Sequence, residues 1–255
     1  MSEKKEEVID HPFATKILLP SRGKFYGEEL PDGEVTIRPM TVQEEKLLLA
    51  RADRQKLIDR LLQKCILSEC IPMPEMLMTD KFFLLLSLRS ITYGQEYTFT
   101  QACRSCGEKY KHTLSLPDGL VMKVANDEDV EPFDLKLPVS GKTLSLRFLR
   151  GKDEEAIDAY GKSVGSVPKE EGDVTYEYRL ARHIVAIDGE PVEDTMEGLN
   201  FCRVMVGGDS LAMRREIAKR ETGIELSVTS VCPSCKEEVT ASVPLTQDFF
   251  PSSVS

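Results

Sequence analysis

The chain has 255 residues and a mass of 28.6 kDa, with 41% hydrophobic and 30% charged residues. It carries 33 Lys and Arg against 43 Asp and Glu, which gives a formal net charge of −10. This length allows one large domain or two small ones, and the acidic balance disfavours binding to an extended phosphate backbone. The longest hydrophobic run, around residues 82–88, is too short to cross a bilayer, so we expect no membrane span.

The N-terminal part combines a charged arm with a region of short strands. Residues 1–14 lack apolar periodicity, which predicts a flexible arm. Residues 15–94 form the first structured region, which begins with predicted strands at residues 16–19 and 35–40. The stretch between these strands is rich in proline and glycine, so we expect it to be a loop.

Two helices are predicted in the remainder of this region. Thr41 and Glu44 are spaced as a capping box, in which two side chains satisfy backbone N–H groups at the start of a helix. Apolar residues at helical spacing extend this helix to residue 66. The second helix, over residues 79–92, is apolar enough to lie in a core and ends before Gly94.

Alternating hydrophobic and polar residues follow, and this pattern is typical of strands. Residues 95–149 contain a predicted hairpin around a CRSCG turn and a second pair of strands. Residues 224–244 repeat the first pattern, with strand-like sequence on both sides of CPSC. We predict that the two segments form one split β region resembling a zinc ribbon.

Residues 150–223, between these segments, have the periodicity of helices. The helical stretches that we predict are residues 153–164, 174–187, 199–207 and 209–222. Residues 245–255 are expected to form a polar C-terminal tail. The predicted fold class is therefore α+β, with two cysteine-bearing β hairpins packed against helices and a helical insert.

Two Cys-x2-Cys pairs carry the strongest chemical signal in the sequence. Cys103 and Cys106 lie in one predicted turn, and Cys232 and Cys235 lie in the other. Two thiolates from one tight turn span an edge of a tetrahedron, so two such turns supply the four ligands of a structural zinc ion. Four thiolates leave no open coordination position, which disfavours catalysis at the metal. At Gly107, directly behind the first pair, we expect a side chain to obstruct the turn.

Two other interpretations of these cysteines stay open. The thiols could be reduced and unliganded, or CPSC could be a redox motif, which it resembles. Redox motifs place the first cysteine at a helix N-terminus, whereas strand-like sequence flanks both pairs here. Cys65, Cys70 and Cys202 lie in apolar helical patterns, and we interpret them as core residues.

No pattern of catalytic residues accompanies the cysteines. Residues 140–144, with the sequence SGKTL, resemble the end of a phosphate-binding loop, but Lys136 occupies the place of the required first glycine. The three histidines form no metal-binding motif, and no serine has an identifiable base. We therefore expect neither enzymatic activity nor a small-molecule substrate.

The alternative function is that of a zinc-ribbon regulator that binds nucleic acid. Tyr97, Phe99 and Tyr110 are interleaved with positively charged residues near the first cysteine pair, as base stacking requires. Aromatic residues on alternating strands more often face a core, and the net charge is unfavourable. The sequence therefore disfavours nucleic acid as a partner.

Several segments resemble a known protein family. The stretches ILLPSRGKFY and EVTIRPMTVQEE are similar to T4-type bacteriophage baseplate hub proteins, in which an LPSxGxFY loop precedes a strand and a helix. The segment from TDKFFLLLSLRSITYG to CRSCG, with the CPSC hairpin and the terminal FF, resembles the longer zinc-ribbon-bearing members of contractile-tailed phages. The resemblance covers both ends and the first hundred residues, but not the stretch from about 120 to 220.

This resemblance implies a structural component or assembly factor of the hub in a contractile-tail baseplate. It implies other hub, spike and tail proteins as partners, and the phage virion, the cytoplasm of the infected bacterium, or both as the location. Whether the family loop contacts partners or braces the fold is open from the sequence. The candidate partner-binding residues are Leu19, Pro20, Ser21, Gly23, Phe25 and Tyr26 of the loop, with Phe249 and Phe250 near the C-terminus.

Overall fold

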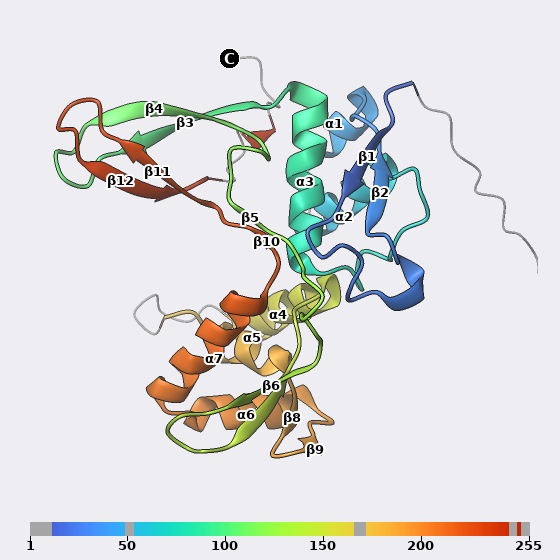
Figure 1. Ribbon diagram of the computed structural model, residues 1–255, viewed down its shortest axis with the longest axis vertical. Coiled ribbons are helices and arrows are strands. Elements are labelled where there is room, and N and C mark those ends of the chain that lie inside the picture. Colours follow the sequence, from blue (N-terminus) through green and yellow to red (C-terminus); the bar gives the residue numbers. More distant parts are fainter. Residues whose placement is uncertain (1–11, 49–53, 166–171, 245–248, 251–255) are drawn as a thin grey trace, which may run out of the picture. The chain divides into compact units, whose positions relative to one another are not determined.

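The computed structural model describes residues 12–48, 54–165, 172–244 and 249–250. The chain divides into two compact units (Figure 1). Unit 1 consists of residues 1–71, 82–124 and 222–255, and unit 2 consists of residues 72–81 and 125–221. The predicted N-terminal arm lies outside the described residues up to residue 11, and so do residues 245–248 and 251–255 of the predicted tail.

Unit 1 begins with a two-stranded antiparallel sheet. β1 (Thr15–Leu18) pairs with β2 (Glu34–Ile37), close to the predicted strands. The loop between them contains the one-turn helix η1 (Gly27–Glu29). At Gly23 the φ angle is +75°, and a Cβ atom would lie 2.0 Å from the carbonyl oxygen of Leu30. Glycine is required there because the loop packs against its own backbone.

In the region of the single helix predicted up to residue 66, the described residues form α1 (Val42–Leu48) and α2 (Arg54–Cys65). Residues 49–53 lie outside the described residues. The capping interaction is present, because the backbone N–H of Thr41 donates to the Glu44 carboxylate at 2.9 Å.

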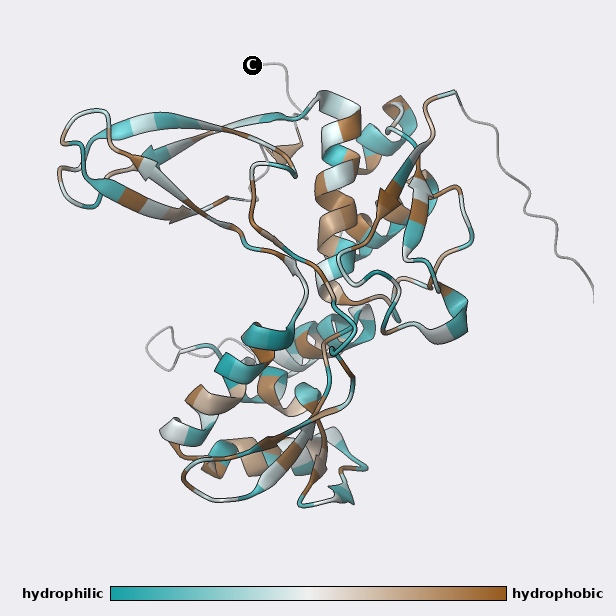
Figure 2. Cartoon of the chain, in the orientation of Figure 1, coloured by the Kyte–Doolittle hydropathy of each residue, from teal (hydrophilic) through white to brown (hydrophobic). Residues whose placement is uncertain are grey.

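The second predicted helix is confirmed as α3 (Met78–Tyr93), which begins in unit 2 and continues in unit 1. Leu84, Leu86 and Leu88 on this helix are fully buried. Hydrophobic colour covers much of α3 in Figure 2. A helix that is apolar around most of its circumference is buried, and the chain turns away at Gly94, whose φ is +92°.

Both cysteine pairs lie at the tips of β hairpins. β3 (Glu96–Ala102) pairs with β4 (Lys109–Ser115), and β11 (Ser227–Val231) pairs with β12 (Glu238–Ser242). The two hairpins are separate two-stranded sheets within the predicted split β region.

A further short pairing joins the segment after β4 to the segment before β11. β5 (Met122–Lys123) and β10 (Gly223–Ile224) form one antiparallel strand pair in unit 1, with two pairs of facing residues.

Unit 2 contains an antiparallel sheet with strand order β6-β7-β8-β9. Its strands are β6 (Phe133–Lys136), β7 (Thr143–Leu146), β8 (Ile184–Ile187) and β9 (Glu190–Pro191). Ser140, Gly141 and Lys142 of the SGKTL stretch lie between β6 and β7, and its last two residues begin β7. Residues 125–149 belong to unit 2, together with the helices that follow. From the sequence, these residues were predicted to belong with the cysteine hairpins.

The helices of unit 2 are α4 (Gly151–Val164), α5 (Tyr176–His183), α6 (Thr195–Val204) and α7 (Gly207–Arg220). The predicted helix over residues 174–187 is wrong in its last part. The chain leaves α5 after His183 and continues as β8, because Ile184, Val185 and Ile187 are β-branched and can pair with β7. The insert is therefore mixed rather than purely helical.

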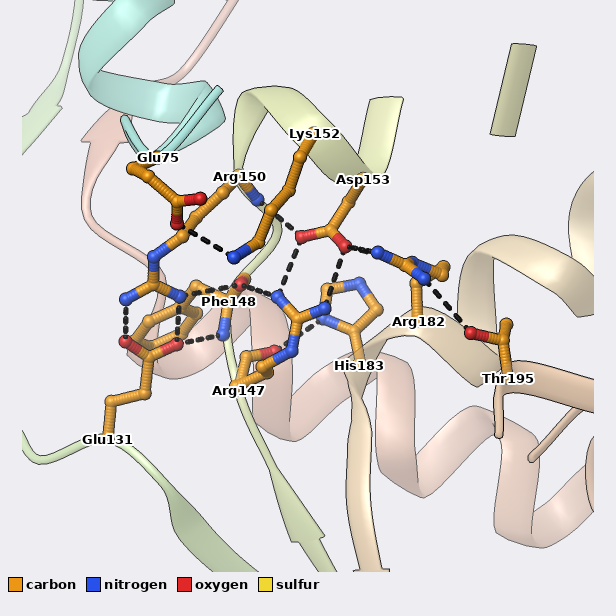
Figure 3. A network of polar contacts seen from close by, with 10 residues as sticks. All are labelled: Glu75, Glu131, Arg147, Phe148, Arg150, Lys152, Asp153, Arg182, His183 and Thr195. Carbon is orange, nitrogen blue, oxygen red and sulfur yellow. Dashed lines mark hydrogen bonds and ion pairs between the residues drawn. The ribbon is translucent and has the colours of Figure 1, made fainter. Parts of the chain in front are cut away.

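A network of buried ion pairs surrounds the start of α4 (Figure 3). The carboxylate of Asp153 is fully buried and accepts hydrogen bonds from Arg147 at 2.6 and 2.7 Å. Arg182 and the backbone N–H of Arg150 also donate to it. Burial alone would raise the pKa of Asp153, but these donors outweigh burial and lower the pKa to about 2. The network thereby joins α4 to the strand region before it and to α5.

His183 lies buried at the end of α5, next to this network (Figure 3). Its Nδ1 atom is 2.8 Å from the carbonyl oxygen of Arg147, so Nδ1 carries the proton and donates it. Burial lowers the pKa of His183 to about 4, which makes the imidazole neutral at pH 7.

We predict that Asp153→Asn destabilises the protein, because Arg147 and Arg182 would lose their shared counter-charge. The expected loss is about 3–5 kcal/mol, measured as a shift in the urea-unfolding transition. Asp158→Asn is the control: it removes an exposed ion pair with Lys162, and its effect should stay below about 0.5 kcal/mol. Equal effects of the two substitutions would contradict this prediction.

Acid should destabilise the protein in two stages. Because the pKa of His183 is about 4 in the folded chain, stability is lost as the pH falls below the unfolded value of about 6.5. Asp153, with its pKa of about 2, contributes stability that is lost only below its ordinary value of about 4. The free energy of unfolding should be measured across this pH range. In His183→Asn, which keeps an N–H donor, the loss of stability between about pH 6.5 and 4 should disappear, and the loss at lower pH should remain. A variant with the same profile as the parent would rule out this role of His183.

Candidate metal centre

The two cysteine turns have the same backbone geometry. In the first, the N–H of Cys103 donates to the Glu108 carbonyl at 2.8 Å, and the N–H of Gly107 donates to the Cys103 carbonyl at 2.9 Å. Residues at the corresponding positions of the second turn make the same two hydrogen bonds, at 2.9 and 3.0 Å. Each turn therefore presents both of its cysteines from a closed loop at a hairpin tip.

The residue behind each pair has a left-handed backbone. Gly107 has a φ of +76°, and Lys236, at the equivalent position, has a φ of +65°. A Cβ atom at Gly107 would meet nothing within 4 Å, so the expectation that a side chain would obstruct the turn is wrong. Glycine suits this position because of its positive φ, and the second turn accepts lysine at some conformational cost.

The structure brings the four cysteine sulfurs of unit 1 together. All four Sγ atoms lie within 4.8 Å of one another. The Cys103 and Cys235 sulfurs are 3.6 Å apart, and those of Cys106 and Cys232 are 3.7 Å apart. A tetrahedral zinc ion with Zn–S bonds of about 2.3 Å separates its sulfurs by about 3.8 Å. Two of the sulfur–sulfur distances are close to this value, and the four side chains could hold a single ion.

The cysteine thiols of the cluster differ in pKa. A hydrogen bond from the backbone N–H of Cys106 lowers the pKa of Cys103 to about 7. At Cys235 the backbone N–H of Glu237 acts in the same direction, but burial and the neighbouring thiols outweigh it and raise the pKa to about 12. One thiol therefore ionises readily while another retains its proton. A divalent ion would stabilise the thiolate form of all four cysteines, and its binding would therefore release the remaining protons.

Side chains near the sulfurs also join the two hairpins. The hydroxyl groups of Tyr110 on β4 and Ser230 on β11 are 2.9 Å apart, and the side-chain amide of Gln101 on β3 donates to the Val239 carbonyl on β12 at 3.4 Å. Val239 packs with Cys103, Cys232 and Tyr110. Gln101 and Ser230 were not predicted from the sequence to belong to the site. Each lies two residues before a cysteine, and this spacing indicates that its side chain lies on the same strand face as that cysteine.

A second set of contacts fixes the base of the first hairpin. The Tyr97 hydroxyl donates to the Pro244 carbonyl at 2.6 Å, and the Tyr97 ring lies 5.4 Å from that of Phe249. Arg89 on α3 lies over the Tyr97 ring at 5.3 Å and donates to the Phe249 carbonyl at 3.4 Å. Phe249 thus anchors the C-terminal part of the chain against the β3 end of α3.

Most of the candidate partner-binding residues are buried in this structure. The family loop turns inward, with Leu19 and Ser21 at 1% and 0% exposure. Phe25 and Phe250 are half-buried and remain accessible in part. Contact with a partner stays a prediction for the whole set, and burial leaves Phe25 and Phe250 as its more accessible members. The buried members of the set are Leu19, Pro20, Ser21, Gly23, Tyr26 and Phe249.

Cys65 and Cys202 are core residues, as predicted, and so are Tyr97 and Phe99. Burial raises the pKa of Cys65 to about 11 and that of Cys202 to about 12, which makes both thiols inert. Cys70 is half-buried. Tyr97 and Phe99 are 3% and 8% exposed, so they cannot stack on bases as the nucleic-acid alternative requires.

Comparison with known proteins gives one family. The family described as T4 bacteriophage base plate protein matches residues 23–251. No curated protein and no solved structure is detectably similar to the chain. Within the described residues, no helix has the length and hydrophobicity needed to cross a membrane.

The purified chain should contain about one zinc ion, measured by elemental analysis of reduced protein. The double substitution Cys103→Ser/Cys232→Ser should abolish this content because it removes one ligand from each hairpin. Cys202→Ser, at a buried cysteine outside the cluster, is the matched control and should keep the metal. Zinc-free parent protein, or loss of the metal in Cys202→Ser, would contradict the assignment.

Proposed function

The chain belongs to the family of T4 bacteriophage base plate proteins, and from this membership we propose that it is a structural component or assembly factor of the hub in a contractile-tail base plate. The family match carries the proposal because it extends over most of the chain, including the stretch from about 120 to 220 that the sequence resemblance left uncovered. The site chemistry agrees with a non-catalytic role, since four thiolates around one ion leave no position for a substrate.

We propose that zinc, held by Cys103, Cys106, Cys232 and Cys235, braces unit 1. The two hairpins are not joined by a backbone ladder, so they are held together by side-chain contacts at their tips and at their base. Closing a long loop adds an entropic cost that rises slowly with its length, whereas a structural zinc site contributes about 10 kcal/mol or more of apparent binding free energy. The ion would therefore fix the C-terminal hairpin against the middle of the chain.

Other hub, spike and tail proteins are the proposed partners, and the phage virion or the infected bacterial cytoplasm is the proposed location. Phe25 and Phe250 are the loop and C-terminal side chains that could reach such partners. A stiff, metal-braced unit suits this task because rigid surfaces lose little entropy on docking.

Disruption of the gene in its phage should yield particles without functional base plates, seen by electron microscopy. The parent gene should restore assembly, whereas Cys103→Ser/Cys232→Ser should restore it poorly because unit 1 loses its brace. Cys202→Ser serves again as the control. Normal base plates without the gene, together with salt-dependent retention of the protein on DNA or RNA, would replace this proposal with the nucleic-acid alternative.

A further inference from the structure

The outward face of α7 is positively charged, although the chain has a net charge of −10. The helix buries Asp209, Met213 and Ile217. With 3.6 residues per turn, Leu211, Arg215 and Lys219 align on the opposite face, and Arg214 lies beside them. All four are exposed.

The acidic residues of α7 do not neutralise this face. Asp209 is buried, and its carboxylate accepts the backbone N–H groups of Val139 and Ser140 at 2.7 and 3.0 Å. Glu216 pairs with Arg220 at 2.6 Å. Within the described part of the chain, Arg214, Arg215 and Lys219 form no ion pair, and Arg214 lies 5.9 Å from the ring centre of Tyr176.

The beginning of this face is apolar. A Cβ atom at Gly208 would lie 3.0 Å from the Cγ2 atom of Val139, so the tip of the β6–β7 hairpin lies over the first turn of α7. Val139 is 65% exposed and Leu211 is 39% exposed. Gly208, Leu211, Arg215 and Lys219 follow one line along the helix, which is about 21 Å long. The line therefore runs from an apolar start to a basic end.

We propose that this α7 surface, formed by Val139, Leu211, Arg214, Arg215 and Lys219, binds an acidic polypeptide segment of a partner protein. Carboxylates of the partner would face the three cations, and an apolar residue at one end of the segment would cover Val139 and Leu211. Charge complementarity between the basic α7 surface and its partner favours an acidic peptide. This complementarity would also set the rate of encounter and the register in which the peptide docks. The net charge of −10 would repel an extended nucleic acid, whereas a short peptide spans only the basic surface. The inference does not depend on the base plate role.

The test uses the full-length chain and a short fluorescent peptide of glutamates that ends in two leucines. Fluorescence anisotropy should show binding that weakens as salt increases. Arg215→Glu/Lys219→Glu should weaken binding by about tenfold or more, because two attractions become repulsions. The matched control, Lys109→Glu/Lys111→Glu, reverses two exposed charges on β4 of unit 1 and should bind as the parent does. Circular dichroism verifies that all variants are folded.

Two further probes separate the alternatives. Leu211→Ala should weaken binding of the leucine-tipped peptide, whereas a purely electrostatic contact would leave it unchanged. An extended DNA duplex, which reaches beyond the basic surface, should bind at least about tenfold more weakly than the peptide. Absence of peptide binding, equal loss in both double variants, or DNA binding as tight as peptide binding would each overturn the proposal.

Discussion

The constraint on which unit 1 depends is the meeting of four sulfur atoms from two hairpin tips. β3–β4 and β11–β12 each satisfy their own backbone hydrogen bonds, and neither ladder extends into the other hairpin. An isolated two-stranded hairpin is only marginally stable in water, so each needs a further interaction. The Tyr110–Ser230 and Gln101–Val239 contacts supply it at the tips, where the proposed metal ion would add to it through the four cysteines. Tyr97, Arg89 and Phe249 supply it at the base.

Unit 2 has a different kind of organising interaction. Its buried carboxylate, Asp153, is shared by Arg147 and Arg182, and its imidazole, His183, is held neutral beside them. An ion-pair network of this kind tolerates the loss of one member poorly, because a charge is then left without its partner. It should also make the unit sensitive to acid, whereas the proposed metal site of unit 1 would be sensitive to both acid and chelators. The two units therefore combine ordinary hydrophobic cores with two distinct polar anchors.

The LPSRGKFY motif forms a loop that is largely buried in unit 1. Its glycine meets a steric and conformational requirement, and Leu19, Ser21 and Tyr26 are buried within unit 1. The motif thus encodes a loop that packs against its own backbone. Surfaces for partners must be sought among exposed residues, and the basic face of α7 is defined by side chains that no such motif includes. Burial and charge, rather than resemblance, are the observations behind that proposal.

The sequence by itself determined the features that depend on neighbouring residues. These include the capping interaction between Thr41 and Glu44, the buried helix α3, the strand pairs and the two cysteine turns, because periodicity and turn chemistry act locally. Coordination chemistry further indicated that the two turns belong together, since two thiolates complete only half of a zinc site. Only the tertiary structure decided that the hairpins stay separate, that the chain changes to β8 after His183, and that Phe249 is buried. These outcomes depend on packing between segments distant in the chain, which local sequence patterns do not encode.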